Sequence, residues 1–245
     1  MWLAPREVCG LRALIDSAAQ VAGRVVFHSP VAGDLHRHLA RVNFYADLPG
    51  NVEITQPVPA LNRRDRRERL LELARIRTTC DVGALYGRVS DIARGQFGTG
   101  SAAARACATA VAAAMENAIE HADSPIGALV SAQRYHGTGL ELAVVDLGRG
   151  IPATLRQNPS HRGLSDLDAV QHALEDGVSS VQEQGRGAGL AALVHDVGRA
   201  GQATLRLSSG AAELTLGWDA GLASVNQSIP ASHVRGTWIA VRLDA

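Results

Sequence analysis

Hydrophobic and polar positions change period several times along the chain, and each change predicts a new element of secondary structure. Apolar residues recur at helical spacing over residues 9–22, which predicts an amphipathic helix. The next segments predict a strand at residues 24–27, a helix at 33–42 and a short strand at 51–54. Two prolines in residues 55–59 then break the pattern, so we place a domain boundary there.

The pattern from residue 70 onward is longer and combines both periods. An alanine-rich segment predicts a helix over residues 101–122, with Ser101 as its N-cap. Leu140, Leu142 and Val144 occupy alternate positions, which predicts that they share a buried face of a strand. Strands are expected at residues 70–76, 126–133, 140–146, 203–207, 213–217 and 237–243, and further helices at 82–93 and 190–199.

The composition is typical of a soluble, globular protein. Hydrophobic residues make up 46% of the 245 residues, and 24 basic residues balance 24 acidic ones. No apolar run approaches the roughly 20 residues that cross a bilayer, so no membrane association is expected. The N-terminus lacks the ordered regions of a signal peptide, and the three cysteines lack metal-ligand spacing. We therefore expect a cytoplasmic protein with reduced thiols.

Every basic residue is an arginine, because the chain contains no lysine. This excludes a Walker A lysine and a Schiff-base lysine. The formal net charge of zero gives no general electrostatic case for nucleic-acid binding, so we expect no nucleic-acid partner. The arginine-rich run at residues 63–69 also contains acidic residues, and we interpret it as a solvated linker or a helix start.

Three short motifs follow one another in the C-terminal half of the chain. The first, residues 116–121, reads Glu-Asn-Ala-Ile-Glu-His and lies in the alanine-rich helix, where Asn117 and His121 share a face. An asparagine inside a helix is mildly unfavourable, because its side chain competes with the backbone for hydrogen bonds. Taken alone, Asn117 is more often a structural amide, and His121 is more often an ordinary core or surface histidine.

The second and third motifs are rich in glycine. Residues 146–152 read Asp-Leu-Gly-Arg-Gly-Ile-Pro and place Asp146 at the end of an apolar strand, where an unpaired carboxylate is costly. An ordinary turn after a strand is the alternative interpretation. Residues 185–190 read Gly-Arg-Gly-Ala-Gly-Leu and lead into an apolar helix, whose free backbone N–H groups suit phosphate. A flexible loop is the alternative there, and a Rossmann motif fails because no strand precedes the glycines.

The three motifs, in this order, resemble the N, G1 and G2 boxes of the GHKL (Bergerat-fold) nucleotide-binding domain. This superfamily contains gyrase-type ATPases, histidine-kinase catalytic domains and anti-sigma-factor kinases. The pair Gly236–Thr237 and the lid-like length of residues 153–184 agree with the resemblance. The resemblance implies an α+β fold with a C-terminal two-layer α/β sandwich, whose mixed sheet is covered by helices on one face. It also implies ATP and Mg²⁺ as cofactors.

The resemblance implies roles for particular residues. Asn117 would ligate Mg²⁺, and Asp146 would accept a hydrogen bond from the exocyclic amine of adenine, with Thr237 joining through water. Arg186 would contact the terminal phosphate. The full set of expected nucleotide-contacting residues is Asn117, Glu120, His121, Asp146, Gly148, Gly150, Ile151, Gly185, Arg186, Gly187, Gly189, Leu190 and Thr237.

One position departs from the family pattern. In members that hydrolyse ATP, a glutamate one turn before the asparagine polarises the attacking group, and Ala113 stands at that position here. Glu116 is turned about 100° away from that face of the helix, and Glu120 lies at the wrong end of it. A general base must reach the proton that it removes, so neither carboxylate is a convincing replacement. We expect weak intrinsic hydrolysis and assign no catalytic residue.

The N-terminal segment resembles the C-terminal half of a STAS-like domain. The resemblance depends on residues 9–14 at the start of a helix, a strand running into residues 28–30, and residues 39–44. It implies a small α/β domain that is truncated at its start. The expected domains are then a STAS-like segment at residues 1–56, a linker at 57–69 and a GHKL domain at 70–245.

The leading functional hypothesis is a regulatory ATP-Mg-binding protein that controls a protein partner through a nucleotide-dependent lid. One alternative is a serine or histidine protein kinase that phosphorylates a separate partner. Another is a nucleotide sensor without turnover. The N-terminal segment would offer a docking or dimerisation surface, so a homodimer is among the expected forms.

Overall fold

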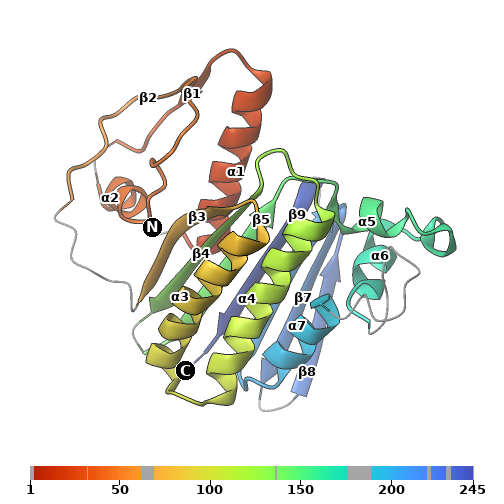
Figure 1. The fold of residues 1–245 in the computed structure, drawn as a ribbon. Coiled ribbons are helices and arrows are strands. Elements are labelled where there is room, and N and C mark those ends of the chain that lie inside the picture. Colours follow the sequence, from red (N-terminus) through yellow and green to blue (C-terminus); the bar gives the residue numbers. More distant parts are fainter. Residues whose placement is uncertain are drawn as a thin grey trace.

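The fold is described from a computed structural model, which covers residues 3–31, 33–61, 69–135, 137–175, 189–219, 222–229 and 233–244. A large sheet has seven strands in the order β3-β4-β5-β9-β6-β7-β8, and a small sheet pairs β1 with β2 (Figure 1). The elements are α1 (Pro5–Val21), β1 (Val25–Phe27), α2 (Asp34–Arg41), β2 (Val52–Ile54), β3 (Leu70–Ile76), α3 (Thr79–Phe97), α4 (Ala102–His121), β4 (Ala128–Tyr135), β5 (Gly139–Asp146), α5 (Gly150–Leu155), η1 (Pro159–His161), α6 (Asp166–His172), α7 (Gly189–Gly198), β6 (Ala203–Gly210), β7 (Ala212–Asp219), β8 (Leu222–Ser228) and β9 (Val234–Leu243).

The large sheet is antiparallel at every described pairing. The α+β class is therefore confirmed, whereas the expectation of a mixed sheet is wrong. Short connections explain two of these pairings. Tyr135 pairs with Gly139 across the β4–β5 connection, and Ser209 pairs with Ala212 across the β6–β7 turn. Antiparallel neighbours need only such short turns, whereas parallel neighbours need a long crossover.

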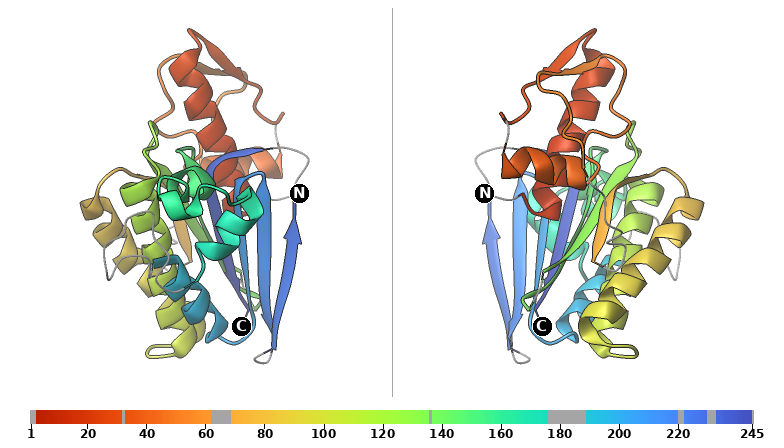
Figure 2. Two further views of the ribbon diagram at one scale, coloured as in Figure 1. Left: turned by 90° about the vertical axis from the view of Figure 1, so that its right-hand side faces the viewer. Right: turned by 90° about the vertical axis from the view of Figure 1, so that its left-hand side faces the viewer.

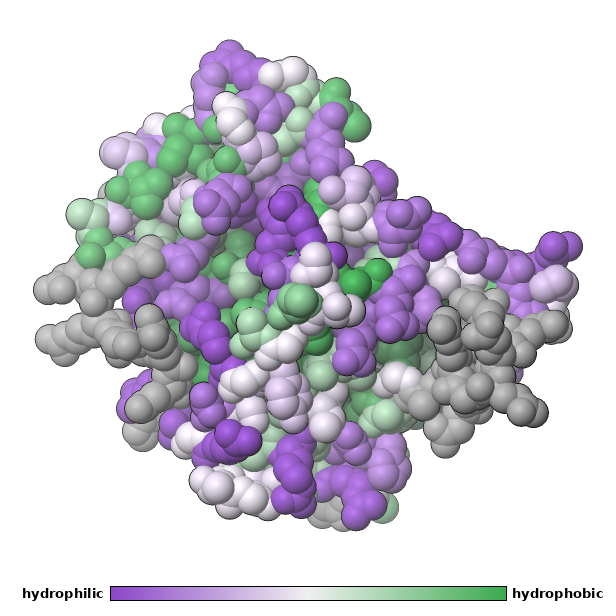
Figure 3. Space-filling model, viewed as in Figure 1, coloured by the Kyte–Doolittle hydropathy of each residue, from purple (hydrophilic) through white to green (hydrophobic). Residues whose placement is uncertain are grey.

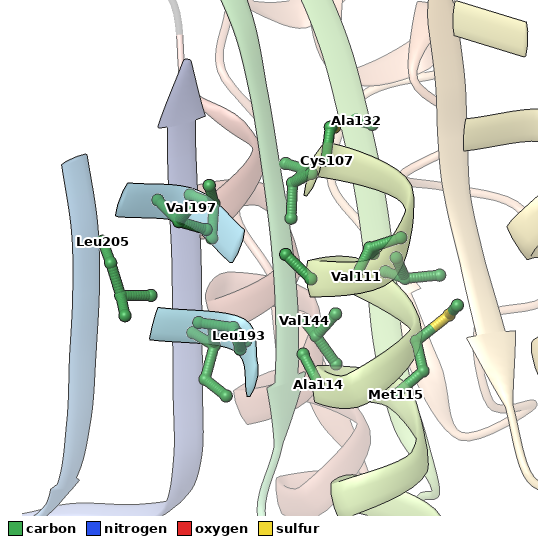
Figure 4. Packing of buried hydrophobic residues seen from close by; sticks show 14 of the residues in the cluster. Cys107, Val111, Ala114, Met115, Ala132, Val144, Leu193, Val197 and Leu205 are labelled. Carbon is green, nitrogen blue, oxygen red and sulfur yellow. The ribbon is translucent and has the colours of Figure 1, made fainter. Parts of the chain in front are cut away.

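Helices α3, α4 and α7 cover one face of the large sheet (Figures 1 and 2). Leu140, Leu142 and Val144 belong to the core on this face, as their alternation predicts. Figure 4 shows α4 side chains such as Val111 and Ala114 directed toward the sheet, beside Val144. The helix starts as predicted, because the backbone N–H of Ala104 donates to Ser101 Oγ at 3.1 Å.

Helix α1 packs against the opposite face of the same sheet. Cys9 and Ala13 lie in one apolar cluster with Ala143 and Val145, which point away from the α3–α4–α7 layer. A β-carbon at Gly10 would lie 2.3 Å from the Trp238 ring, so this glycine lets α1 approach the sheet closely. This second covering was not anticipated from the sequence.

A buried ionic network joins α1 to the rest of the protein. Arg12 donates to Asp16 Oδ1 at 2.9 Å and to the carbonyl of Phe44 at 2.7 Å. Arg75 of β3 also pairs with Asp16. Both Arg12 and Asp16 are buried, so the network fixes α1, the turn after α2 and β3 relative to one another.

The N-terminal segment also contacts one edge of the large sheet. The backbone N–H of Leu73 in β3 donates to the carbonyl of Val42 at 2.9 Å. Leu70 and Leu73 pack with Val42 and Phe44 in a third apolar cluster. The segment at residues 1–56 therefore contacts both a face and an edge of the sheet, while the division into domains at residues 57–69 stays a prediction.

Three elements escaped the sequence analysis, namely α5 inside the second motif, the short η1 after it and β8 near the C-terminus. Among the described helices, none combines the length and apolarity that a bilayer crossing needs. Figure 3 shows apolar residues gathered over the N-terminal segment. The exposed large apolar side chains outside β8 and its flank are Leu14, Val21, Val26, Val31, Val58 and Tyr86.

Candidate functional site

Three buried polar side chains lie side by side at one end of the large sheet. They are Asp146 at the end of β5, Thr237 on β9 and Ser209 on β6. Val145 pairs with Trp238, and Thr237 pairs with Ser209, so the three residues occupy neighbouring positions on three adjacent strands. Their exposed fractions are 1%, 4% and 0%, respectively. Each continues the alternation of the helix-covered face, so all three point toward the α3–α4–α7 layer.

The Asp146 carboxylate is enclosed by backbone donors. The N–H of Gly148 donates to Asp146 Oδ1 at 2.8 Å, and the backbone N–H of Thr237 is a second donor. Burial nevertheless raises the pKa of Asp146 from 3.8 to about 6, because loss of water outweighs these two hydrogen bonds. A carboxyl group that is close to its pKa at neutral pH is typical of a functional position.

Ser209 links this row of residues to the second motif. Its hydroxyl accepts a hydrogen bond from the N–H of Ile151 at 2.9 Å and donates to the carbonyl of Gly236 at 2.7 Å. It lies 3.5 Å from Thr237 Oγ1. The sequence analysis missed Ser209, because its place beside Thr237 depends on strand register and no local motif marks it.

Glycines allow the backbone to close around Asp146. A β-carbon at Gly148 would lie 1.9 Å from the carbonyl oxygen of Ala122, so only glycine fits there. Gly236 has a φ of +77°, and a β-carbon on it would lie 2.1 Å from the carbonyl oxygen of Asp146. Gly150 also has a positive φ, and Ser209 Oγ would meet its β-carbon at 2.8 Å.

The end of α4 brings the first motif next to the second. The backbone N–H of Arg149 donates to the carbonyl of Ala122 at 2.8 Å, and its guanidinium donates to the carbonyl of His121 at 3.3 Å. His121 lies 3.8 Å from the carboxylate of the exposed Glu120. Asn117 is half-buried one turn earlier. Within the described residues, no hydrogen bond or ion pair joins Asn117 to Asp146.

The structure describes only the last two residues of the third motif. Gly185, Arg186 and Gly187 lie outside the described residues, so their expected phosphate contacts stay predictions. Gly189 begins α7, and Leu190 is 8% exposed and packs in the core on the helix-covered face. Helix α7 lies against α4, and Thr109 of α4 donates to Asp196 of α7 at 2.6 Å.

The expected lid contains a helix that is fastened to the sheet. Helix α6 begins after Ser165, whose Oγ accepts from the N–H of Asp168 at 3.1 Å. Asp166 accepts from the N–H of Ala211 at 2.7 Å, in the β6–β7 turn, and from Arg156 at 2.6 Å. This part of the expected lid is therefore tied to the β6–β7 turn, and residues 176–188 lie outside the described residues.

Ala113, where the GHKL resemblance would place a general base, packs against the core on the helix-covered face and is half-buried. In the part of the chain that the structure describes, no three or more His, Cys, Asp or Glu side chains are grouped to hold a metal ion. A Mg²⁺ ion bound with a nucleotide relies mainly on phosphate and water oxygens, so a single asparagine fits that chemistry.

Comparison with protein-family models and with curated proteins found no match to this chain. The buried row of Asp146, Thr237 and Ser209, the glycines around it and the adjoining end of α4 are therefore the basis for a functional assignment.

Proposed function

We propose that this chain is a regulatory ATP-Mg-binding protein of the histidine kinase-like (GHKL) type, which controls a protein partner. One observation carries the proposal. A buried carboxylate, Asp146, lies at a strand end between a glycine turn and Thr237, and two backbone amides hold its orientation. Such a fixed acceptor in a dry environment suits recognition of a purine amine, since hydrogen bonds are stronger there than in water.

The carboxylate has acceptor capacity left for a base. An ionised carboxylate offers about four lone-pair positions, and the amides of Gly148 and Thr237 take two of them. The exocyclic amine of adenine can donate to one that remains. Guanine has a carbonyl oxygen at the corresponding position, so two acceptors would face each other. The proposal therefore includes a preference for ATP over GTP.

Access to Asp146 supplies a route for regulation. The residue is only 1% exposed, so a base reaches the carboxylate only after neighbouring residues move. Helix α5 begins within the second motif, and the backbone N–H of its Ile151 donates to Ser209. Nucleotide binding would displace this region and change the surface that a protein partner meets.

The phosphate and metal contacts are the remaining part of the proposal. Asn117 on α4 would offer its amide oxygen to Mg²⁺, while phosphates and waters complete the coordination. The glycines before α7 would offer backbone N–H groups to the phosphates, at the positive end of the helix dipole.

Ala113 favours a second candidate, a nucleotide sensor without turnover. A methyl group cannot remove a proton from water or from a hydroxyl, so this position supplies no general base. Incubation with ATP labelled at the γ-phosphate distinguishes the possibilities. Label on a partner would indicate a kinase, free phosphate would indicate an ATPase, and neither, together with measurable affinity, would indicate a sensor.

Calorimetric titration with ATP and Mg²⁺ tests the proposal directly. We expect the native chain to bind ATP more tightly than GTP. Asp146→Asn should lower ATP affinity at least tenfold, because an amide that donates toward the adenine amine replaces an acceptor. Asp123→Asn is the matched control, since Asp123 is an exposed acid just beyond α4.

Two results would contradict the proposal. The first is a native chain that binds no ATP at millimolar concentration. The second is equal ATP affinity in the native chain and in Asp146→Asn, with circular dichroism showing that both are folded.

A further inference from the structure

Among the residues that the structure describes, strand β8 (Leu222–Ser228) forms an open edge of the large sheet. All seven of its residues are exposed, and this distinguishes it from every other strand of that sheet. Its described pairing is with β7 alone. Figure 2 shows the sheet edge-on, with β8 as its outermost strand on one side. Such a strand presents a row of unpaired backbone N–H and C=O groups to any chain that can pair with it.

The strand lacks the features that usually protect an edge. Its sequence, Leu-Ala-Ser-Val-Asn-Gln-Ser, contains no charged residue and no proline. Leu222 and Val225 are 78% and 62% exposed, and Ile229 just beyond the strand is 73% exposed. Soluble proteins usually protect such an edge from pairing with a charged residue, a proline or a bulge. The absence of charge and proline from this strand therefore indicates an interaction surface.

The opposite edge of the sheet, by contrast, is contacted by the N-terminal segment. Strand β3 has an irregular register between Leu71 and Ala74, and the N–H of Leu73 is bonded to the carbonyl of Val42. The β3 edge is therefore irregular and already bonded to its own chain, which makes it a poorer partner for the β8 edge of another copy. The favoured pairing between identical chains is β8 with β8, which has two-fold symmetry and stops at two subunits.

We propose that β8 is the interface of a homodimer, in which two copies pair antiparallel through this strand and form one continuous sheet. Val225 is the central residue of the strand, so full overlap places it opposite Val225 of the second copy. Leu222 is then opposite Ser228, and Ser224 is opposite Asn226. No charged residue faces another in this register.

Apolar side chains on one face of the sheet also favour a second copy of this chain as the partner of β8. Val225 pairs with Leu216 of β7, and both lie on the helix-covered face because Leu214 belongs to its core. Leu216 is half-buried and packs against that core. Pairing of two β8 strands would place Leu216, Val225 and their counterparts in one row, so the apolar layer would continue across the two-fold axis.

Sedimentation velocity over a wide concentration range tests the interface. One strand pair buries less surface than the roughly 1,600 Å² of a standard interface, so we expect a reversible dimer in the micromolar range. Val225→Lys places like charges opposite each other and should weaken dimerisation at least tenfold. Val26→Lys is the matched control, because Val26 is an exposed apolar residue on strand β1 and should leave the dimer unchanged.

Disulfide trapping tests the register. Cys80 is the exposed cysteine among the described residues, whereas Cys9 and Cys107 are buried, so Cys80→Ser provides the background. Val225→Cys should form an intersubunit disulfide faster than Leu222→Cys, because position 225 faces its own counterpart. A native chain that stays monomeric at submillimolar concentration would overturn the proposal. A dimer that is equally sensitive to both lysine variants, or that crosslinks equally at both positions, would also overturn it.

Discussion

At the scale of single residues, the chemistry of the candidate site depends on Asp146. Its neighbours were predictable to different degrees. The glycines and Thr237 follow from motifs in the sequence, because a turn after a strand and a terminal Gly-Thr are local features. Ser209 could not be predicted, because it meets Thr237 only through the register of β6 and β9. Contacts between distant strands are not encoded in any short window of sequence.

The raised pKa of Asp146 predicts a particular dependence of stability on pH. The native carboxyl group binds its proton more tightly than the unfolded one, since its pKa is about 6 instead of 3.8. Its contribution to the free energy of unfolding is therefore present at low pH. This contribution, on the order of 3 kcal/mol, is lost as the pH rises from the unfolded pKa to the native one. We expect the unfolding free energy of Asp146→Asn, relative to the native chain, to increase over this interval.

Urea unfolding at a series of pH values measures this difference. The comparison does not depend on any constant offset that the amide introduces into the packing. Parallel curves for the native chain and the variant would show that Asp146 has no raised pKa.

At the scale of elements, amphipathic and alternating patterns predicted most helices and strands. Prediction from these patterns failed for elements whose burial or composition is unusual. Strand β8 is exposed on both faces, so it has no apolar alternation to detect. Helix α5 begins with glycine and proline, which are typical of turns. The antiparallel order of the large sheet was also missed, because strand order depends on how the elements pack and not on their individual periods.

The buried network on α1 gives a prediction about one element. Asp16→Ala leaves Arg12 buried beside backbone carbonyls without its carboxylate partner, and breaking a buried pair costs about 3–5 kcal/mol. Glu53→Ala is the control, because Glu53 pairs with Arg24 on the surface and its loss should change stability little. Chemical denaturation compares the two. Equal effects would mean that the network does not hold α1 in place.

At the scale of the whole molecule, the N-terminal segment is integrated with the sheet. Its helix α1 covers Ala143 and Val145, and the carbonyl of its Val42 accepts a hydrogen bond from Leu73 at the β3 edge. An independent docking module, as the STAS-like resemblance suggests, would leave the sheet complete without it. These contacts favour one cooperative folding unit.

Removal of residues 1–56 tests whether the segment is dispensable. We expect the shortened chain to expose the apolar face beneath α1, to bind a hydrophobic dye and to lose its cooperative thermal transition. The full chain, measured in parallel, should show a single transition. A shortened chain with a native-like transition and little dye binding would support a separate domain.

Leu147 lies between Asp146 and Gly148 in the chain and belongs to the apolar cluster under α1. The carboxylate that we propose as a purine acceptor and the N-terminal helix therefore lie on opposite faces of the same strand end. A protein partner that pulls α1 away from the sheet would remove the packing around Leu147. The neighbouring carboxylate of Asp146 would then be less firmly held. Thermodynamic coupling is reciprocal, so a nucleotide that changes the surroundings of Asp146 would also change the stability of the contact between α1 and the sheet.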